Sequence, residues 1–293
     1  MRRALVVFGS CVIVPLLLIS VACADNADKQ EQMDFIVAAL KSQLQAAGKT
    51  LEVIYDYQSV GSDGSAAGEI VPVKYLRTPA RVMFLEQEGQ FLVTKGSYDT
   101  AKGELRRYSL LKADNSQRGS IIGDSCYPLR SSTVMDPVLC MVEDGFLLDK
   151  IGRGVLADSK EDIDGHACYR IDVIPEDEAV RAPYTVWLDP EIGCCPRRVI
   201  IEYKEERGPT VAEFSDYIEL GDGIWFPQKI KRSVDMALLR KKVPSLTSDT
   251  VELFSDVKSV RLVETDLQNP PIVEFPSGTK VTDEITGMIY TVN

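Results

Sequence analysis

Residues 73–84 of the chain, VKYLRTPARVMF, consist of two runs of strand-forming residues on either side of the dipeptide Thr78-Pro79. Proline after a short polar residue is typical of a turn, so this stretch predicts a β-hairpin. Similar runs lie before and after it, separated by breaks too short for a crossover helix. The chain therefore predicts an antiparallel meander. Before the hairpin, Leu51, Val53, Tyr55 and Tyr57 alternate with polar or smaller residues and predict a first strand. The further expected strands cover residues 70–76, 80–87, 90–97 and 105–112.

The strand pattern returns in the second half of the chain. Val, Ile, Tyr and Phe alternate with polar residues there, and turn sequences such as Asp189-Pro190 separate the runs. A shorter run at 272–275 predicts one more strand. The longer strands are expected at residues 166–174, 184–188, 197–204, 210–220, 224–234 and 250–263.

Two segments have the period of a helix. In residues 28–47 the apolar side chains recur at helical spacing, and Gly48 predicts the end of the helix. The second segment covers residues 136–154, where Asp136 is the expected N-cap and Pro137 the first helical residue. The apolar residues of the first helix are Met33, Ile36, Val37, Leu40 and Leu44.

The first residues have the pattern of an export signal. Arg2 and Arg3 precede an uncharged run, residues 4–22, and Ala22-Cys23-Ala24 fits a cleavage site. We expect residues 1–24 to be removed, so that residues 25–293 form a single domain in the periplasm or outside the cell, with no integral membrane segment. An uncleaved anchor and lipidation of Cys23 are the alternatives.

Composition excludes several classes of protein. The 293 residues are 45% hydrophobic and 26% charged, which is typical of a soluble globular protein. The formal net charge is −11, and removal of Arg2 and Arg3 with the signal makes it −13 (31 basic against 44 acidic residues). So acidic a chain offers no evident surface for nucleic acid. A single histidine excludes a histidine pair and a histidine-rich zinc site.

Short motifs indicate neither a cofactor nor a metal. Gly48-Lys49-Thr50 ends like a phosphate-binding loop, but Gln43 stands where that loop needs glycine. Gly152, Gly154 and Ala157 fit a dinucleotide pattern without the required strand before them. The acidic run 158–165 lacks the carboxylates of a calcium loop at the required positions and predicts a solvated turn. His166 follows that turn at the start of a strand, where we expect no catalytic role. A hydrolase that uses carboxylates is the open catalytic alternative.

Five cysteines remain after removal of the signal: Cys126, Cys140, Cys168, Cys194 and Cys195. A disulfide between Cys126 and Cys140 is one expectation, because it would close a short loop. The alternative is that all five are small buried apolar groups.

Three stretches resemble a known family, the LolA/LolB-like lipoprotein carriers and lipoprotein-sorting proteins. Residues 73–84 are similar to the family's strand, Arg-Pro turn and strand. Residues 275–283, FPSGTKVTD, look like its closing element, and residues 186–203 are similar to a late hairpin. The chain departs from the family by extra sequence at residues 228–273 and by its cysteines.

The resemblance implies a mainly β (α+β) fold. It consists of a single curved antiparallel sheet, a half-barrel, covered by the N-terminal helix and a mid-chain helical lid. It further implies a non-enzymatic carrier that holds the acyl chain of a lipid or lipoprotein in an apolar cavity. The alternative is an envelope sensor or scaffold of the same fold, with other envelope proteins as partners and no small ligand.

By the same resemblance, Arg77 occupies the position of an arginine that reaches from the sheet to the helical lid. Its five N–H groups can hold lid carbonyls, so Arg77 would be a latch between a closed and an open form. The alternative is an ordinary arginine at the end of a strand, in solvent.

Overall fold

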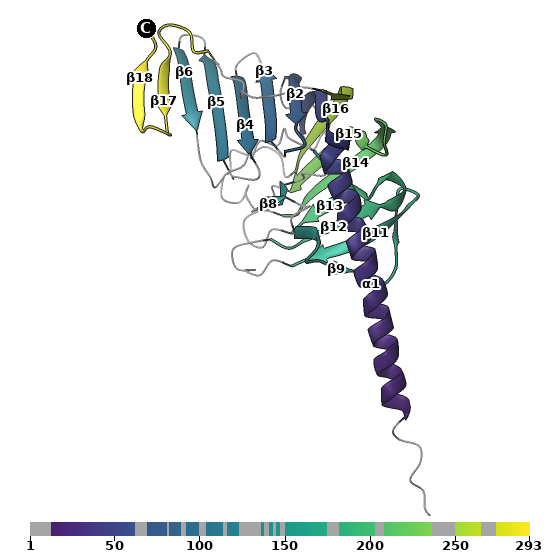
Figure 1. Ribbon diagram of the computed structural model, residues 1–293. Coiled ribbons are helices and arrows are strands. Elements are labelled where there is room, and N and C mark those ends of the chain that lie inside the picture. The colour runs from purple at the N-terminus through teal and green to yellow at the C-terminus, as the bar shows by residue number, and fades with distance from the viewer. Residues whose placement is uncertain are drawn as a thin grey trace, which may run out of the picture.

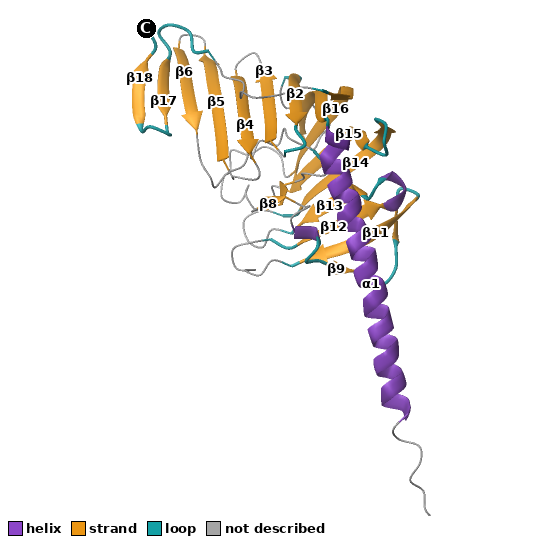
Figure 2. Ribbon diagram, viewed as in Figure 1, coloured by secondary structure: helices purple, strands orange, loops and turns teal. Residues whose placement is uncertain are grey.

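The computed structural model describes residues 13–61, 69–80, 82–88, 92–99, 104–113, 116–122, 136–137, 141–142, 145–146, 150–174, 182–202, 208–235, 250–264 and 274–293. Within them one long helix, α1 (Ile13–Gln45), is followed by the short turn η1 (Ala46–Gly48). Figure 2 shows the C-terminal part of this helix against a large sheet, while its N-terminal part extends beyond the strands. Among the described helices, none combines the length and the hydropathy needed to cross a bilayer.

The first half of the sheet is the expected meander. Its strands are β1 (Thr50–Gly61), β2 (Val71–Arg77), β3 (Val82–Glu88), β4 (Leu92–Asp99), β5 (Glu104–Ala113) and β6 (Ser116–Ile122). Each pairs antiparallel with the next. The sequence analysis found five of these strands and missed β6, where serines and Gly119 dilute the strand pattern.

The second half is also antiparallel. It contains β9 (Val155–Leu156), β10 (Glu161–Ile163), β11 (His166–Val173), β12 (Tyr184–Asp189), β13 (Cys195–Ile201), β14 (Thr210–Glu219), β15 (Trp225–Asp235) and β16 (Thr250–Val263), with the turn η2 (Pro190–Ile192) between β12 and β13. The strand β10 lies within the run 158–165 that was expected to be only a turn.

Strand β16 joins the two halves into one sheet, because it pairs with β15 on one side and with β1 on the other. The strand order is β10-β11-β12-β13-β14-β15-β16-β1-β2-β3-β4-β5-β6-β17-β18, and the sheet is not closed into a barrel (Figure 1). The extra sequence at 228–273 thus supplies most of β15 and all of β16, at the middle of the sheet.

From Met33 onward, helix α1 packs against one face of the sheet, over the half that runs from β11 to β2 (Figure 1). Met33, Ile36, Leu40 and Leu44 are buried, as their spacing predicted. They form one core with the inner face of the sheet, the face toward α1. Its buried side chains come from β1, β2, β9 and β11–β16 and include Leu51, Val53, Tyr55, Val73, Ile171, Val186, Leu188, Phe226 and Val257.

Two sequence predictions are wrong. The mid-chain segment 136–154 is not a helical lid: within its described residues, β7 (Met141–Val142) pairs with β8 (Gly145–Phe146), and helical residues occur only at 150–151. The helical spacing of apolar residues was misleading there, because β7 and β8 form a short hairpin in that segment. Glu274 and Phe275 are not in a strand either. The strands near the end are β17 (Lys280–Asp283), which runs parallel to β6, and β18 (Met288–Thr291).

The closing element has a clear structural reason. The Phe275 ring lies over Gly119 of β6, where an added Cβ would come within 2.7 Å of the ring. Val281 of β17 is fully buried beside it. The glycine therefore allows the last hairpin to pack against β6.

The contacts of Glu52 make the free energy of unfolding depend on pH. It lies on the outer face of β1, where Arg261 Nε donates to its Oε1 at 2.7 Å and Lys74 Nζ lies 3.3 Å from its Oε2. Burial opposes its charge, but the hydrogen bonds from Arg261 and Lys74 outweigh burial, and the pKa of Glu52 is lowered from 4.5. Because the pKa of Glu52 is lower in the folded than in the unfolded state, its ionised carboxylate stabilises the fold at pH values above the unfolded-state pKa. This stabilisation is lost as the pH falls through the folded-state pKa.

We therefore expect Glu52→Gln to be less stable than the wild type at neutral pH and to approach it below pH 4.5. Urea unfolding across this range measures the difference. Glu213→Gln is the matched control, because the Glu213 side chain, paired with Arg198, is 39% exposed against 11% for Glu52. If the loss of stability relative to the wild type depended on pH in the same way for Glu52→Gln and Glu213→Gln, the prediction would be contradicted.

Candidate functional site

A cluster of buried polar groups lies where α1 ends on the sheet. We call Gln43, Tyr75, Arg77 and Asp136 the helix-end cluster. Arg77 Nη1 donates to both oxygens of Asp136, at 2.7 and 2.6 Å, and Arg77 Nη2 donates to the backbone carbonyl of Gln43 at 2.9 Å. Tyr75 Oη donates to Asp136 Oδ2 at 3.0 Å. The cluster joins the first hairpin, the helix and the mid-chain segment.

The period of β2 explains why an arginine at the end of a strand is buried. Val71, Val73, Tyr75 and Arg77 alternate along β2 and all face the core. The Arg77 residue is 2% exposed, so its side chain does not lie in solvent. Its charge is compensated by Asp136, which is 1% exposed. Its Nε is buried without a hydrogen-bond partner among the described residues.

The side chain of Gln43 fixes the helix to two turns of the sheet. Its Nε2 donates to the Gly223 carbonyl at 2.7 Å, and its Oε1 accepts from the Trp225 amide at 2.9 Å. At Gly193, which has φ 65°, an added Cβ would lie 2.1 Å from Gln43 Nε2. The β12–β13 turn thus needs glycine both for its backbone conformation and for the contact with the helix.

Burial shapes the electrostatics of this region. Burial, followed by the charge of Asp136, raises the pKa of Tyr75 well above 10.0. Burial likewise raises the pKa of the Cys195 thiol, and the charges of Arg77, Asp136 and Asp189 act on it as well. Tyr75 and Cys195 therefore stay protonated, and the charges of the helix-end cluster are those of Arg77 and Asp136.

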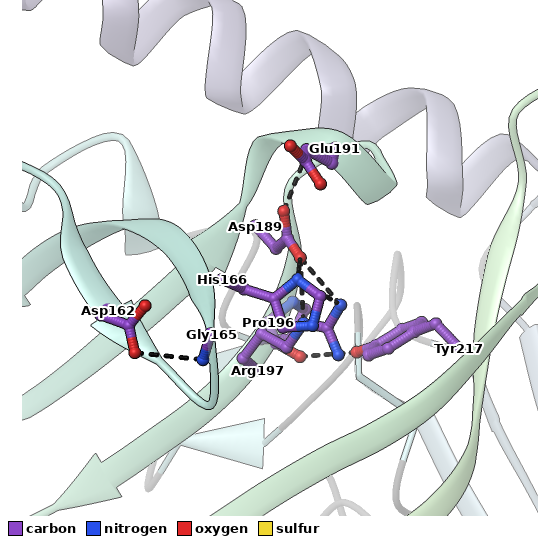
Figure 3. A network of polar contacts seen from close by, with 8 residues as sticks. All are labelled: Asp162, Gly165, His166, Asp189, Glu191, Pro196, Arg197 and Tyr217. Carbon is purple, nitrogen blue, oxygen red and sulfur yellow. Dashed lines mark hydrogen bonds and ion pairs between the residues drawn. The ribbon is translucent and has the colours of Figure 1, made fainter.

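A second cluster fixes the β12–β13 turn (Figure 3). Asp189 is 1% exposed; its Oδ1 accepts from the Glu191 amide at 2.9 Å, and its Oδ2 accepts from Arg197 Nε and Nη2 at 3.0 and 2.9 Å. The half-exposed ring of His166 reaches Asp189 Oδ2 through Nδ1 at 3.4 Å. Arg197 also lies over the Tyr217 ring, 5.1 Å from its centre.

Ligand atoms of His166, Asp189 and Glu191 lie within 4.8 Å of one another, as a metal site would need. Both oxygens of Asp189 already accept hydrogen bonds, however, and the guanidinium of Arg197 occupies the space with a positive charge. A second cation would be repelled there. These contacts explain a well-defined turn better than a metal centre.

Three cysteines are buried free thiols: Cys168, Cys194 and Cys195. Burial, followed by the charge of Asp189, raises the pKa of Cys168 to about 11 and that of Cys194 to about 12. They are therefore protonated at neutral pH and act as small apolar groups. Cys126 and Cys140 lie outside the described residues, so their pairing stays a prediction.

Sequence reasoning singled out Arg77 but missed its partners. Asp136 was expected to be a helix cap, and Gln43 was considered only as a departure from a phosphate-binding loop. Asp136 is 59 residues and Gln43 is 34 residues from Arg77 in the sequence. No local pattern links positions so far apart.

Comparison with known proteins gives matches in structure alone. No family model matches the chain, and no curated protein matches it in sequence. A Vibrio parahaemolyticus domain described as an outer membrane lipoprotein-sorting protein aligns over 76% of this chain and 91% of its own, with TM-score 0.50 and 12% identity. A DUF1329 family protein from Desulfovibrio piger aligns over 80% and 93%, with TM-score 0.53 and 14% identity.

A LolA-superfamily protein from Nitrosomonas europaea aligns over 79% of this chain and 93% of its own, with TM-score 0.44 and 11% identity. At such identities the similarity concerns the fold. The chain therefore has the fold of the Vibrio parahaemolyticus domain and of the Desulfovibrio piger protein.

Proposed function

We propose that the protein is an exported, non-enzymatic carrier that holds the acyl chain of a lipid or lipoprotein between α1 and the inner face of the sheet. The proposal rests on the contacts that hold α1 on the sheet. An apolar helix stripe fills the inner face, and a buried ion pair at one end of the helix holds its last turn. An acyl chain has the chemistry of the side chains that it would replace.

The buried ion pair is better suited to a switch than to stability. Burying two charges costs several kcal/mol of solvation, which their attraction only partly returns. The unpaired Arg77 Nε adds to this cost. A closed form held by such a pair lies close in free energy to an open form, so ligand binding can shift the balance. In this proposal Arg77 is the latch that holds the helix.

Further polar groups of the inner face suit the ester end of a lipid. Tyr55 Oη and Ser255 Oγ are buried without hydrogen-bond partners among the described residues. They lie on the neighbouring strands β1 and β16, where Tyr55 pairs with Val257, two residues from Ser255. Two hydroxyl donors in an apolar surface could bind the carbonyl of an acyl ester.

The test compares ligand binding with and without the latch. Arg77→Met/Asp136→Leu removes both charges and leaves neither stranded, so the variant is expected to fold. Burial of the apolar replacements costs no solvation of charge, so the variant should favour the closed form and weaken binding of cis-parinaric acid, a fluorescent long-chain fatty acid, by roughly 5- to 150-fold. Fluorescence titration measures the affinity, and a synthetic triacylated lipopeptide should compete.

Arg170→Met/Asp172→Leu is the matched control, because this ion pair lies on the outer face with side chains 38% and 37% exposed. It should bind like the wild type. If wild-type protein and latch variant both fail to bind the fatty acid and the lipopeptide, the carrier function is wrong and a sensor or scaffold without a small ligand is favoured. If wild type and latch variant bound with equal affinity, the role of Arg77 as a latch would be contradicted, but the carrier function would not.

A further inference from the structure

The last strand of the sheet, β18, is exposed on both faces and along one edge. Within the described residues β18 pairs with β17 alone, and Figure 1 shows it as the outermost strand, far from α1. Met288, Ile289 and Tyr290 are 55%, 63% and 40% exposed, and Ile285 in the adjoining turn is 51% exposed. Four of the ten large apolar side chains that are exposed in the described residues therefore lie in this one hairpin.

This edge lacks the features that normally prevent strand pairing. Natural edge strands carry charged residues, proline or a bulge. Residues 288–292, MIYTV, contain neither a charge nor a proline, although the whole chain has a formal net charge of −11. The pairing with β17 is regular, without a bulge.

The hydrogen bonds show which groups of β18 are free to pair. The Val292 amide donates to the Thr279 carbonyl at 3.0 Å, on the β17 side. Backbone groups alternate in direction along an antiparallel strand, so those of Met288 and Tyr290 also point to β17. The N–H and C=O groups of Ile289 and Thr291 then point away from the sheet.

We propose that β18 is a dimerisation edge that pairs antiparallel with β18 of a second copy. Outward-pointing residues must face each other, so a two-fold axis at Tyr290 sets Ile289 opposite Thr291 of the other copy and Met288 opposite its Val292. This register uses the full strand and gives an uncharged patch on one face, from Met288, Tyr290 and Val292 of both copies. The charged residues Lys280 and Asp283 belong to β17, on the far side of each β18, and so stay outside this contact.

The register makes a specific cross-linking prediction. Tyr290 faces its own copy in a non-hydrogen-bonded pair, where Cα atoms lie about 4.5 Å apart, within the range of a disulfide. Tyr290→Cys should therefore form a disulfide-linked dimer on mild oxidation. Val155→Cys, at an exposed apolar position on the opposite edge of the sheet, is the control and should not do so.

Sedimentation velocity of the purified protein tests the dimer itself. Thr291→Pro removes an outward N–H and leaves the pairing with β17 intact, so it should raise the dimer dissociation constant at least tenfold and yield a folded monomer. Val155→Lys should leave the dimer unchanged, whereas Ile289→Lys should weaken it. A wild type that stays monomeric at its highest soluble concentration, or that forms open polymers, would overturn the proposal. So would a dimer that Thr291→Pro and Ile289→Lys do not affect.

Discussion

Replacing Asp136 by leucine is expected to lower the free energy of unfolding by about 3–5 kcal/mol, because Arg77 would keep its charge in a buried site without a counter-ion. In the wild type both guanidinium contacts of Arg77 Nη1 go to Asp136, and Tyr75 Oη donates to the same carboxylate. The substitution therefore leaves two buried donors without their acceptor. Urea unfolding of the purified variant measures the loss.

The double variant Arg77→Met/Asp136→Leu separates the ion pair from the space that it fills. Replacement of a whole buried ion pair by apolar groups is often neutral or stabilising. We therefore expect the double variant to be more stable than Asp136→Leu alone. On the outer face, Asp172→Leu should cost no more than about 1 kcal/mol, because the side chains of Asp172 and its partner Arg170 are partly accessible to water. If Asp136→Leu were as mild as Asp172→Leu, the buried pair would not hold the helix end.

Much of the sheet could be predicted from the sequence because its strands obey a local rule. Leu51, Val53 and Tyr55 alternate with polar or smaller residues, and all three are buried in the core. The same alternation marks β16, whose predicted bounds agree with the structure. Short connections then required antiparallel pairing, so the order of the meander followed from loop lengths alone.

The mid-chain segment and the site were harder to predict, for physical reasons. The apolar residues between 136 and 154 fit a helical spacing, but the β7–β8 hairpin forms there instead. Asp136 has the sequence context of a helix cap, and only the folded sheet brings Arg77 to it. Long-range pairs of this kind depend on register across the whole fold, and a single sequence does not contain that information.

The last hairpin shows another limit of sequence patterns. Strands β17 and β18 have four residues each, which is too short for a reliable period. Their placement depends on the parallel pairing of β17 with β6, on the Phe275 ring over Gly119, and on the burial of Val281. The resemblance of residues 275–283 to a family element indicated that this stretch closes the fold, but it did not indicate the strands.

Replacing Leu40 by alanine is the sharpest test of whether α1 can leave the sheet as a unit. Leu40 is 1% exposed and packs in the core between the helix and the sheet. Truncation of a buried leucine costs about 2–5 kcal/mol. Phe35→Ala is the matched control on the same helix, because Phe35 is 52% exposed and its loss should change stability by no more than about 0.5 kcal/mol.

Amide hydrogen exchange shows which elements lose protection when Leu40 is replaced by alanine. If α1 is a lid, Leu40→Ala weakens its docking, and the amides of residues 33–44 should exchange roughly thirtyfold faster or more, while β1 and β16 keep their protection. This result is expected because α1 contributes one layer of the core and the strands also hold one another through their ladders. If helix and strands lost protection together and by the same factor, α1 would belong to a single cooperative unit with the sheet, and opening by release of the helix would be excluded.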